Sequence, residues 1–348
     1  MTSVKEKSAI LLIYTGGTIG MKEDPSIQAL RPFDFSQILA EVPELQKFAY
    51  KIDTYTFDPL IDSSDIEPGI WKQLVEIIEE KYKDYDGFVI LHGTDTMAYS
   101  ASALSFMCEG LTKPVIFTGS QLPIGVPRTD GKENLISAVE IAAAKDLEGH
   151  AVVPEVCIYF DNVLMRGNRT TKVNSDNFRA FRSENLPPLA EAGINIRYNR
   201  STIIKPSNWE RSPVFHKELD TRVSILKLHP GITPQVVSSI LYGEESRAVI
   251  IETYGAGNAP SKKWFMDMVR DISRKGKILM NVTQCRAGSV NMDIYATGKN
   301  LKDAGVVNGF DSTTESALAK LFYLMGLHQD NLSVKTLLSE DLRGEISK

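Results

Sequence analysis

AILLIY, residues 9–14, runs directly into TGGT, residues 15–18, and this stretch indicates the class of fold. A run of six hydrophobic residues bounded by a turn signal predicts a buried strand. A strand without polar side chains on either face is typical of a parallel sheet that helices cover on both sides. We therefore expect an α/β fold whose first strand ends in a glycine-rich loop.

The same order of strand, turn and helix continues through the first half of the chain. The predicted elements are a helix from Trp71 to Tyr82, a strand at 87–91, a helix at 97–107, a strand at 115–118, a helix at 134–144 and a strand at 156–160. Such alternation indicates βαβ units and a mostly parallel sheet. Ligand sites of these sheets lie at the carboxyl ends of the strands, so we expect the functional residues there.

A second α/β unit is expected in the C-terminal part. The predicted elements are strands at 223–228, 248–251 and 277–282, a helix beginning at Pro234, a helix at 262–274 and a helix ending at Leu327. Ser312 followed by Glu315 is a capping-box pattern for the start of the last helix.

The boundary between the two units is predicted where periodicity fails. Residues 195–217 are polar and contain prolines such as Pro206 and Pro213, which is typical of a linker. A chain of 348 residues also exceeds the usual size of one domain. We therefore predict two α/β domains. The larger N-terminal catalytic domain covers 1–194, with a mostly parallel sheet flanked by helices, and the smaller C-terminal domain covers 218–348.

Composition excludes several classes of protein. The formal net charge is -5 and no segment concentrates lysine and arginine, so nucleic acid is not an expected partner. The apolar run at 9–14 is too short for a signal sequence or a membrane span, which predicts a cytoplasmic protein without a membrane partner. The widely spaced Cys108, Cys157 and Cys285 form no disulfide framework, and we expect reduced thiols that pack as small core residues.

Cofactor and metal chemistry find no support in the motifs. Gly255-Ala256-Gly257 opens like a dinucleotide fingerprint, but Pro260 takes the place of its third glycine. Residues 125–132 have glycines one position too far apart for a phosphate loop, and Glu133 replaces its hydroxyl. The five histidines lack zinc-site spacing, and there is no G-x-S-x-G elbow. We expect neither a cofactor nor a metal.

Two hydroxyl-bearing segments remain, YTGGTIG at 14–20 and LHGTDT at 91–96. Both resemble the signature segments of the asparaginase and glutaminase amidohydrolases. Further stretches resemble the bacterial cytoplasmic type I branch of that family: DSSD at 62–65, GSQ at 119–121, RGNRTTK at 166–172, YGAGNAP at 254–260 and YATG at 295–298. The resemblance extends over nearly the whole chain, in family order.

The resemblance implies hydrolysis of L-asparagine to L-aspartate and ammonia. It assigns Thr18 as the residue that the substrate acylates, assisted by a second set made of Thr94, Asp95 and Lys172. The residue types suit this chemistry, because a threonine hydroxyl needs a base and an oxyanion pocket. The glycines before Thr18 let backbone N–H groups come close. A lysine buried away from water loses its proton more readily and can act as a base toward Thr94.

Substrate-binding residues also follow from the resemblance. It implies that Asp62 and Ser63 hold the α-carboxyl and α-amino end of the substrate and that Ser120 lines the amide pocket. It further implies a homodimer or homotetramer in which Asn258 reaches the active site of a neighbouring subunit.

Each motif has a simpler explanation when taken alone. Gly16-Gly17 is a common turn after a strand, and Thr94-Asp95-Thr96 is a common helix N-cap. Lys172 alone predicts an ordinary surface lysine, and Asp62-Ser63 alone predicts a turn. Their combination in one order favours the amidohydrolase.

Two positions depart from the family pattern. Family members commonly carry a tyrosine in the flap that follows the nucleophile, but residues 21–35 contain none, and the aligned position is near Ala29. Tyr55 or another tyrosine is then needed to activate Thr18, unless the flap works differently. Glu252 stands where some type I relatives have an arginine that binds a regulatory asparagine. A carboxylate would repel that ligand, so activation by asparagine is not expected.

Two other functions stay open on the sequence. The subunit that supplies ammonia to a tRNA-dependent amidotransferase shares these motifs, although it usually has an N-terminal extension. A sensor that binds an amino acid without turning it over is the second alternative, because a fold does not guarantee an activity.

Overall fold

A computed structural model of the chain describes residues 8–24, 29–32 and 38–347. The chain divides into two compact units, Met1–Lys217 and Glu218–Lys348. Each unit has its own sheet and its own hydrophobic core. The predicted α/β class, with a larger, mostly parallel sheet followed by a smaller α/β unit, is confirmed.

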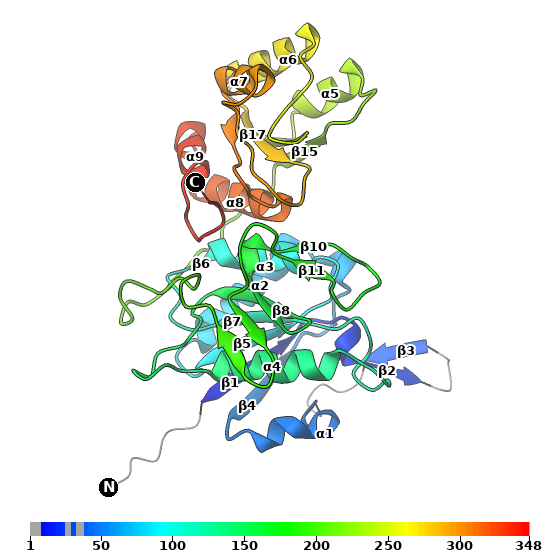
Figure 1. Cartoon of the computed structure of the whole chain (residues 1–348), viewed down its shortest axis with the longest axis vertical. Coiled ribbons are helices and arrows are strands. Elements are labelled where there is room, and N and C mark those ends of the chain that lie inside the picture. Colours follow the sequence, from blue (N-terminus) through cyan, green and yellow to red (C-terminus); the bar gives the residue numbers. More distant parts are fainter. Residues whose placement is uncertain (1–7, 25–28, 33–37, 348) are drawn as a thin grey trace. The chain divides into compact units, whose positions relative to one another are not determined.

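An eight-stranded sheet forms the centre of the first unit (Figure 1). Its spatial order is β13 (Ile196–Tyr198), β12 (Ala190–Ala192), β9 (Val163–Arg166), β8 (Val156–Phe160), β7 (Val115–Thr118), β5 (Gly87–Leu91), β1 (Ala9–Tyr14) and β4 (Lys51–Thr56). The five strands from β8 to β4 are parallel to one another. The pairs β8–β9, β9–β12 and β12–β13 are antiparallel. The parallel strands β5, β7 and β8 are completely buried because helices cover both faces.

The helices of this unit connect the parallel strands. They are α1 (Ile38–Glu41), α2 (Pro68–Lys81), α3 (Met97–Met107) and α4 (Gly131–Ala143), with short 3-10 turns η1 (Thr18–Gly20), η3 (Pro43–Lys47), η4 (Ser63–Asp65) and η5 (Gly167–Arg169). Leu135 and Ala138 of α4 belong to the same buried cluster as Ile10 and Leu12 of β1. Side chains alternate along a strand, so α4 covers the face to which Ile10 and Leu12 point.

Three small two-stranded sheets complete the first unit. They are the pairs β2 (Met21–Asp24) with β3 (Ala29–Pro32), β10 (Thr171–Lys172) with β11 (Phe181–Arg182), and β6 (Cys108–Glu109) with β14 (Val214–Phe215). The range 195–217, expected as a linker, contains both β13 and β14, and these strands pair with β12 and β6. It is therefore part of the first unit. The periodicity fails there because the paired strands are only two or three residues long.

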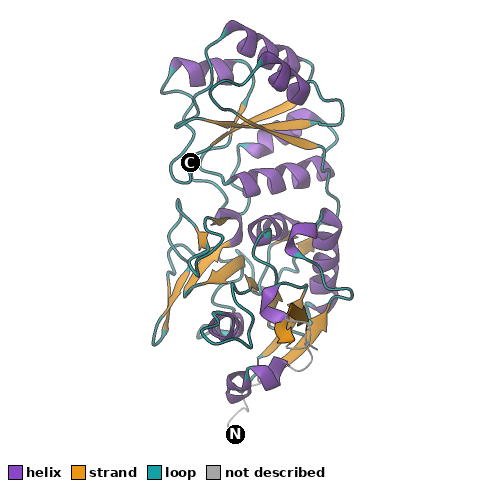
Figure 2. Cartoon of the chain, turned by 90° about the vertical axis from the view of Figure 1, so that its right-hand side faces the viewer, coloured by secondary structure: helices purple, strands orange, loops and turns teal. Residues whose placement is uncertain are grey.

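The second unit is a four-stranded parallel sheet between two groups of helices (Figure 2). Its strands, in spatial order, are β15 (Val223–Lys227), β16 (Ala248–Thr253), β17 (Ile278–Thr283) and β18 (Val307–Asn308). Its helices are α5 (Pro234–Leu241), α6 (Lys263–Arg274), α7 (Ala296–Asp303), α8 (Thr314–Leu327) and α9 (Asn331–Leu338). Phe265 of α6 is fully buried in the core of this unit, in the same cluster as Leu226 of β15.

Two local predictions in this part of the molecule are wrong. The cap of α8 is Thr313, whose hydroxyl accepts from Ser316 N, and not Ser312. The helix begins one residue later than the capping-box pattern indicates. Cys108 and Cys157 are buried as expected, but Cys285 is exposed because it lies in the loop that follows β17. Within the described ranges, no helix has the length and apolar character needed to cross a membrane.

Candidate active site

Three strands of the larger sheet end level with one another and bring their loops together. Tyr14 of β1 is the register partner of Leu91 of β5, and Leu91 is the partner of Thr118 of β7. Backbone hydrogen bonds continue beyond these ends, from Thr15 N to Leu91 O at 3.0 Å and from His92 N to Thr118 O at 3.0 Å. The segments after the strands therefore begin side by side, as expected for the ligand edge of a parallel sheet.

Glycines let the backbones of these loops touch. Gly16 has φ 140°, and a Cβ atom there would lie 2.1 Å from Ile61 O. Gly17 has φ 94°, and its Cβ would lie 2.7 Å from Gly93 Cα. A Cβ on Gly93 would in turn lie 2.4 Å from Ser63 Cβ. No other residue fits such contacts, so the glycines bring the segments around Thr18, Ser63 and Thr94 together.

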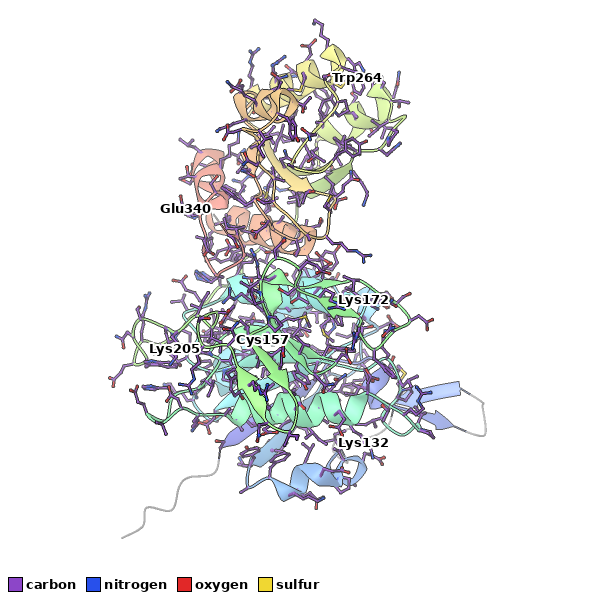
Figure 3. All side chains as sticks on the ribbon, in the orientation of Figure 1. Lys132, Cys157, Lys172, Lys205, Trp264 and Glu340 are labelled. Atoms are coloured by element: carbon purple, nitrogen blue, oxygen red, sulfur yellow. The ribbon has the colours of Figure 1, made fainter. Side chains whose placement is uncertain are left out.

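Lys172 joins the second predicted set. It lies on β10, where its register partner is the buried Phe181. Lys172 Nζ donates to Thr94 Oγ1 at 2.8 Å and to Asp95 Oδ1 at 2.6 Å. The Lys172 side chain is only 17% exposed, whereas that of Asp95 is 66% exposed. Thr94, Asp95 and Lys172 therefore form one contiguous group, and Lys172, labelled in Figure 3, is not an ordinary surface lysine.

Thr18 is the first residue of the turn η1, and Tyr14 fixes the backbone before it. The Tyr14 hydroxyl donates to Gly17 O at 3.1 Å. Burial raises the pKa of Tyr14 far above its usual value, so this hydroxyl remains a neutral donor. Gly20 leaves room for the ring, because a Cβ there would lie 2.2 Å from it. The sequence places Tyr14 at the end of a strand and at the start of the YTGGTIG segment, but predicts no role for its hydroxyl.

The two positions considered for the activation of Thr18, Ala29 and Tyr55, lie on the strands β3 and β4. Position 29 lies on β3, opposite Asp24 in the β2–β3 hairpin. Tyr55 is 41% exposed on β4 and packs edge-on against Phe57 at 5.9 Å between ring centroids. Among the described residues, none forms a side-chain hydrogen bond with the Thr18 hydroxyl. Residues 25–28 and 33–37, which include part of the expected flap, lie outside the described ranges.

Asp62 and Ser63 lie on the loop that follows β4. Asp62 caps η4 and accepts from Ser64 N at 2.8 Å and from Ser64 Oγ at 2.7 Å. Both hydrogen bonds lower the pKa of Asp62, and the one from the backbone N–H has the larger effect. The exposed carboxylate of Asp62 therefore stays charged. Ser63 is buried, and its hydroxyl donates to Gly93 O at 2.9 Å and accepts from Thr96 N at 3.0 Å. Ser63 thus holds the Thr94 loop in place.

Ser120 is buried, and its hydroxyl is engaged within its own loop. It donates to Leu122 O at 2.6 Å. The neighbouring Gln121 is the residue of this loop whose side chain reaches the second set, because Thr94 Oγ1 donates to Gln121 Oε1 at 3.4 Å. The sequence contained Gln121 inside the GSQ motif, but nothing in its residue type or spacing distinguished it from a surface glutamine.

His92 is another residue that sequence reasoning did not select. It is fully buried, and burial lowers the pKa of its imidazole to about 4. Trp71 Nε1 donates to Ser100 Oγ at 2.9 Å, which leaves the Ser100 hydroxyl to donate to His92 Nε2, also at 2.9 Å. His92 Nδ1 then carries the proton and donates to Gly93 O at 2.7 Å. A neutral imidazole therefore supports the carbonyl immediately before Thr94.

Asn258 and Glu252 belong to the second unit. Asn258 follows β16, and its Oδ1 accepts from Thr297 Oγ1 at 2.7 Å. Glu252 is buried at the end of β16, where Thr314 Oγ1 donates to it at 2.6 Å and Lys227 Nζ lies 3.3 Å away. The carboxylate of Glu252 is thus paired within its own unit.

One group of potential metal ligands is present among the described residues. Atoms of Asp146, Glu148 and His150 lie within 4.8 Å of one another. Asp146 Oδ1 accepts from the backbone N–H groups of Glu148 and His150, both at 3.0 Å, so a tight turn accounts for their proximity. These residues connect α4 to β8 and lie apart from the carboxyl-end loops described above.

Comparison with known proteins identifies the family. The family profile described as asparaginase, N-terminal, matches residues 9–204, and the profile described as glutaminase/asparaginase C-terminal domain matches residues 222–338. The chain belongs to the asparaginase family. The predicted family membership is therefore confirmed.

Two bacterial L-asparaginases are similar to this chain over nearly the whole length of both proteins. L-asparaginase 1 of Escherichia coli strain K12 is 44% identical over 347 residues, which cover 98% of this chain and 99% of that protein. The crystal structure of L-asparaginase I from Vibrio cholerae has a TM-score of 0.89 and 42% identity, with 98% and 100% of the two chains covered. The 60 kDa lysophospholipase of Mus musculus is 41% identical, but the match covers only 62% of that longer protein.

Proposed function

We propose that the protein hydrolyses L-asparagine to L-aspartate and ammonia through an ester on Thr18. The Thr18 oxygen attacks the side-chain amide carbon, the carbon–nitrogen bond breaks, and the nitrogen gains a proton and leaves as ammonia. Water then attacks the ester carbon, which releases L-aspartate and restores the Thr18 hydroxyl. Membership of the asparaginase family supports this reaction.

The observation that carries the proposal is the contact between Lys172 and Thr94 next to the Thr18 loop. Lys172 Nζ and Thr94 Oγ1 are 2.8 Å apart, within reach for proton transfer. In the proposed mechanism Thr94 passes the proton of the attacking group to uncharged Lys172, and the proton then returns to the departing nitrogen, which leaves as ammonia. Asp95 orients the lysine and, through its exposed carboxylate, receives the ammonium group of the substrate.

Substrate binding is assigned to the loops that surround these residues. The charged carboxylate of Asp62 suits the α-amino group of an amino acid. In the proposal Ser63 lies beside Asp62 at the same end of the substrate and Ser120 lines the amide side. Their hydroxyls also hold the Thr94 loop and the Gln121 loop, respectively.

We further propose a cytoplasmic homodimer or homotetramer in which Asn258 completes the site of a neighbouring subunit. Neither nucleic acid nor a membrane takes part in the proposed reaction. Sedimentation of the purified protein, combined with activity at increasing dilution, tests this assembly. Full activity in a monomer would contradict a shared site.

One assay tests the reaction itself. Ammonia release is measured with L-asparagine, L-glutamine and D-asparagine as separate substrates, and the expected result is turnover of L-asparagine. Binding of L-asparagine without ammonia release would instead identify an amino-acid sensor. Turnover that requires a co-purifying subunit and tRNA would identify an amidotransferase component.

A further inference from the structure

Gln121 lies in the loop after β7 with its backbone firmly held. Both carboxylate oxygens of Asp130 accept from Gln121 N, each at 3.0 Å, and Asp130 Oδ1 also accepts from Leu122 N at 3.1 Å. Asn134, one turn further along α4, donates from its side chain to Asp130 Oδ2 at 3.2 Å. The position of the Gln121 side chain is therefore set by the start of α4.

The side-chain amide of Gln121 connects two different loops. Its Nε2 donates to Asn177 O at 3.0 Å, and its Oε1 accepts from Thr94 Oγ1 at 3.4 Å. Only this orientation satisfies both contacts, because a reversed amide would place its oxygen against the Asn177 carbonyl. The contact with Thr94 is the longer of the two, at 3.4 Å.

This orientation determines the direction of the hydrogen bonds at Thr94. The Thr94 hydroxyl has one proton, which it donates to Gln121, and its lone pairs then face Lys172 Nζ at 2.8 Å. Lys172 and Asn177 belong to the same stretch of chain, 172–177. That stretch therefore holds Thr94 from two sides, directly through Lys172 and indirectly through Gln121.

We propose that Gln121 is a positioning residue that holds the Thr94 oxygen within reach of Lys172 Nζ and ties the Lys172 loop to the Thr94 loop. The inference rests on the proposed function, in which Thr94 and Lys172 carry the proton. The Gln121 amide borders an open pocket of about 540 Å³, lined also by Arg128 and Phe178, so a substitution there does not disturb the core.

The test compares Gln121→Met and Gln121→Glu with two controls. Gln121→Met removes both hydrogen bonds, whereas Gln121→Glu keeps the acceptor for Thr94 and loses the donor to Asn177 O. Gln73→Met is the matched control on an exposed face of α2. Ser175→Ala is the second control, because it removes an exposed hydroxyl from the same loop and leaves Asn177 and its carbonyl unchanged.

Two readouts are measured on the intact protein. The first is ammonia release, for which we expect kcat of Gln121→Met to fall about tenfold while KM changes less than about twofold, because misplacement of a reacting group affects mainly the chemical step. Gln121→Glu should recover part of the lost kcat, and both controls should match the wild type.

The second readout does not depend on activity. Acetylation of Lys172 by a limiting amount of acetic anhydride is followed by mass spectrometry, with the other lysines as internal references. We expect Gln121→Met to raise the relative labelling of Lys172 at least about threefold, since Thr94 is no longer held as its hydrogen-bond partner. Unchanged labelling, or an unchanged kcat in an active enzyme, would overturn the inference. Absence of ammonia release in the wild type would count against the proposed function, and the labelling result would still decide the role of Gln121.

Discussion

Lys172 Nζ lies 2.8 Å from Thr94 Oγ1, although 78 positions separate the two residues in the sequence. The same nitrogen lies 2.6 Å from Asp95 Oδ1. A two-residue strand, β10, is enough to bring the lysine there because β11 pairs with it through Phe181, which is buried. The second set of the proposed mechanism therefore depends on a short hairpin outside the main sheet.

Replacement of Lys172 should show whether it acts as a base in the reaction or only as a charged surface residue. We expect Lys172→Met to lower kcat for ammonia release by at least about a hundredfold, in the range that removal of a general base produces. Lys72→Met, on an exposed face of α2, is the control and should leave kcat unchanged. Near wild-type turnover by Lys172→Met would show that this lysine is not the base.

Replacement of the proposed nucleophile should abolish the reaction without unfolding the protein. Thr18→Val keeps the shape of the side chain and removes the hydroxyl, so no ester can form. We expect no ammonia release and an unchanged circular dichroism spectrum. Thr18→Ser is the matched control, because it keeps a hydroxyl and should retain part of the activity. Turnover by Thr18→Val would remove Thr18 from the mechanism.

The backbones of the Thr18 loop and the Thr94 loop touch at Gly17, so we expect any side chain at this position to destabilise the protein. In Gly17→Ala the alanine must adopt a φ of 94°, and its Cβ atom would lie only 2.7 Å from Gly93 Cα. Gly149→Ala is a close control, because Gly149 has φ 88° but open space around its Cβ position. We expect Gly149→Ala to lower the free energy of unfolding by about 1 kcal/mol. Gly17→Ala should cost about 2 kcal/mol more, because the loops must separate.

Urea unfolding followed by fluorescence measures both glycine variants. Equal losses of stability in Gly17→Ala and Gly149→Ala would contradict the close approach of the Thr18 and Thr94 loops. Ammonia release should also fall in Gly17→Ala only, since that substitution displaces Thr18.

The buried imidazole of His92 predicts a pH dependence of stability. Its pKa in the folded protein is about 4, below the usual value of 6.5, so the unfolded chain takes up the proton first as the pH falls. The contribution of neutral His92 to the free energy of unfolding is fully present above pH 6.5. It is lost as the pH falls toward 4, by about 1.4 kcal/mol per pH unit.

A pKa that differs between the folded and unfolded protein makes stability depend on pH. The test is therefore to measure the free energy of unfolding of the wild type and of His92→Gln between about pH 7.5 and about pH 4.5. The difference between the two proteins should shrink as the pH falls. His229→Gln, at an exposed position, provides the control. A difference that stays constant over this range would show that His92 does not titrate with a lowered pKa.

The sequence predicted the regular elements better than the contacts among loops. The bounds of β5, α3, β7 and β8 match their predictions, because continuous apolar runs between turn signals leave little choice of structure. Thr94 and Lys172 could be associated only through family resemblance, since no periodicity relates positions so far apart. Gln121 was missed for a related reason, because its role depends on a carbonyl at Asn177 that no sequence pattern marks.

The order of strands in the larger sheet has a consequence for synthesis of the chain. β1 is the second strand from one edge, between β4 and β5, and Thr15 bonds to a carbonyl 76 positions later. Until β5 emerges from the ribosome, β4 is the only neighbour that can pair with β1. One edge of this wholly apolar strand therefore stays open in the nascent chain, and an open strand edge pairs readily with other chains. Fragments that end before residue 87 should aggregate rather than fold, and expression of the intact protein should benefit from slow synthesis or from a chaperone that shields its first strand.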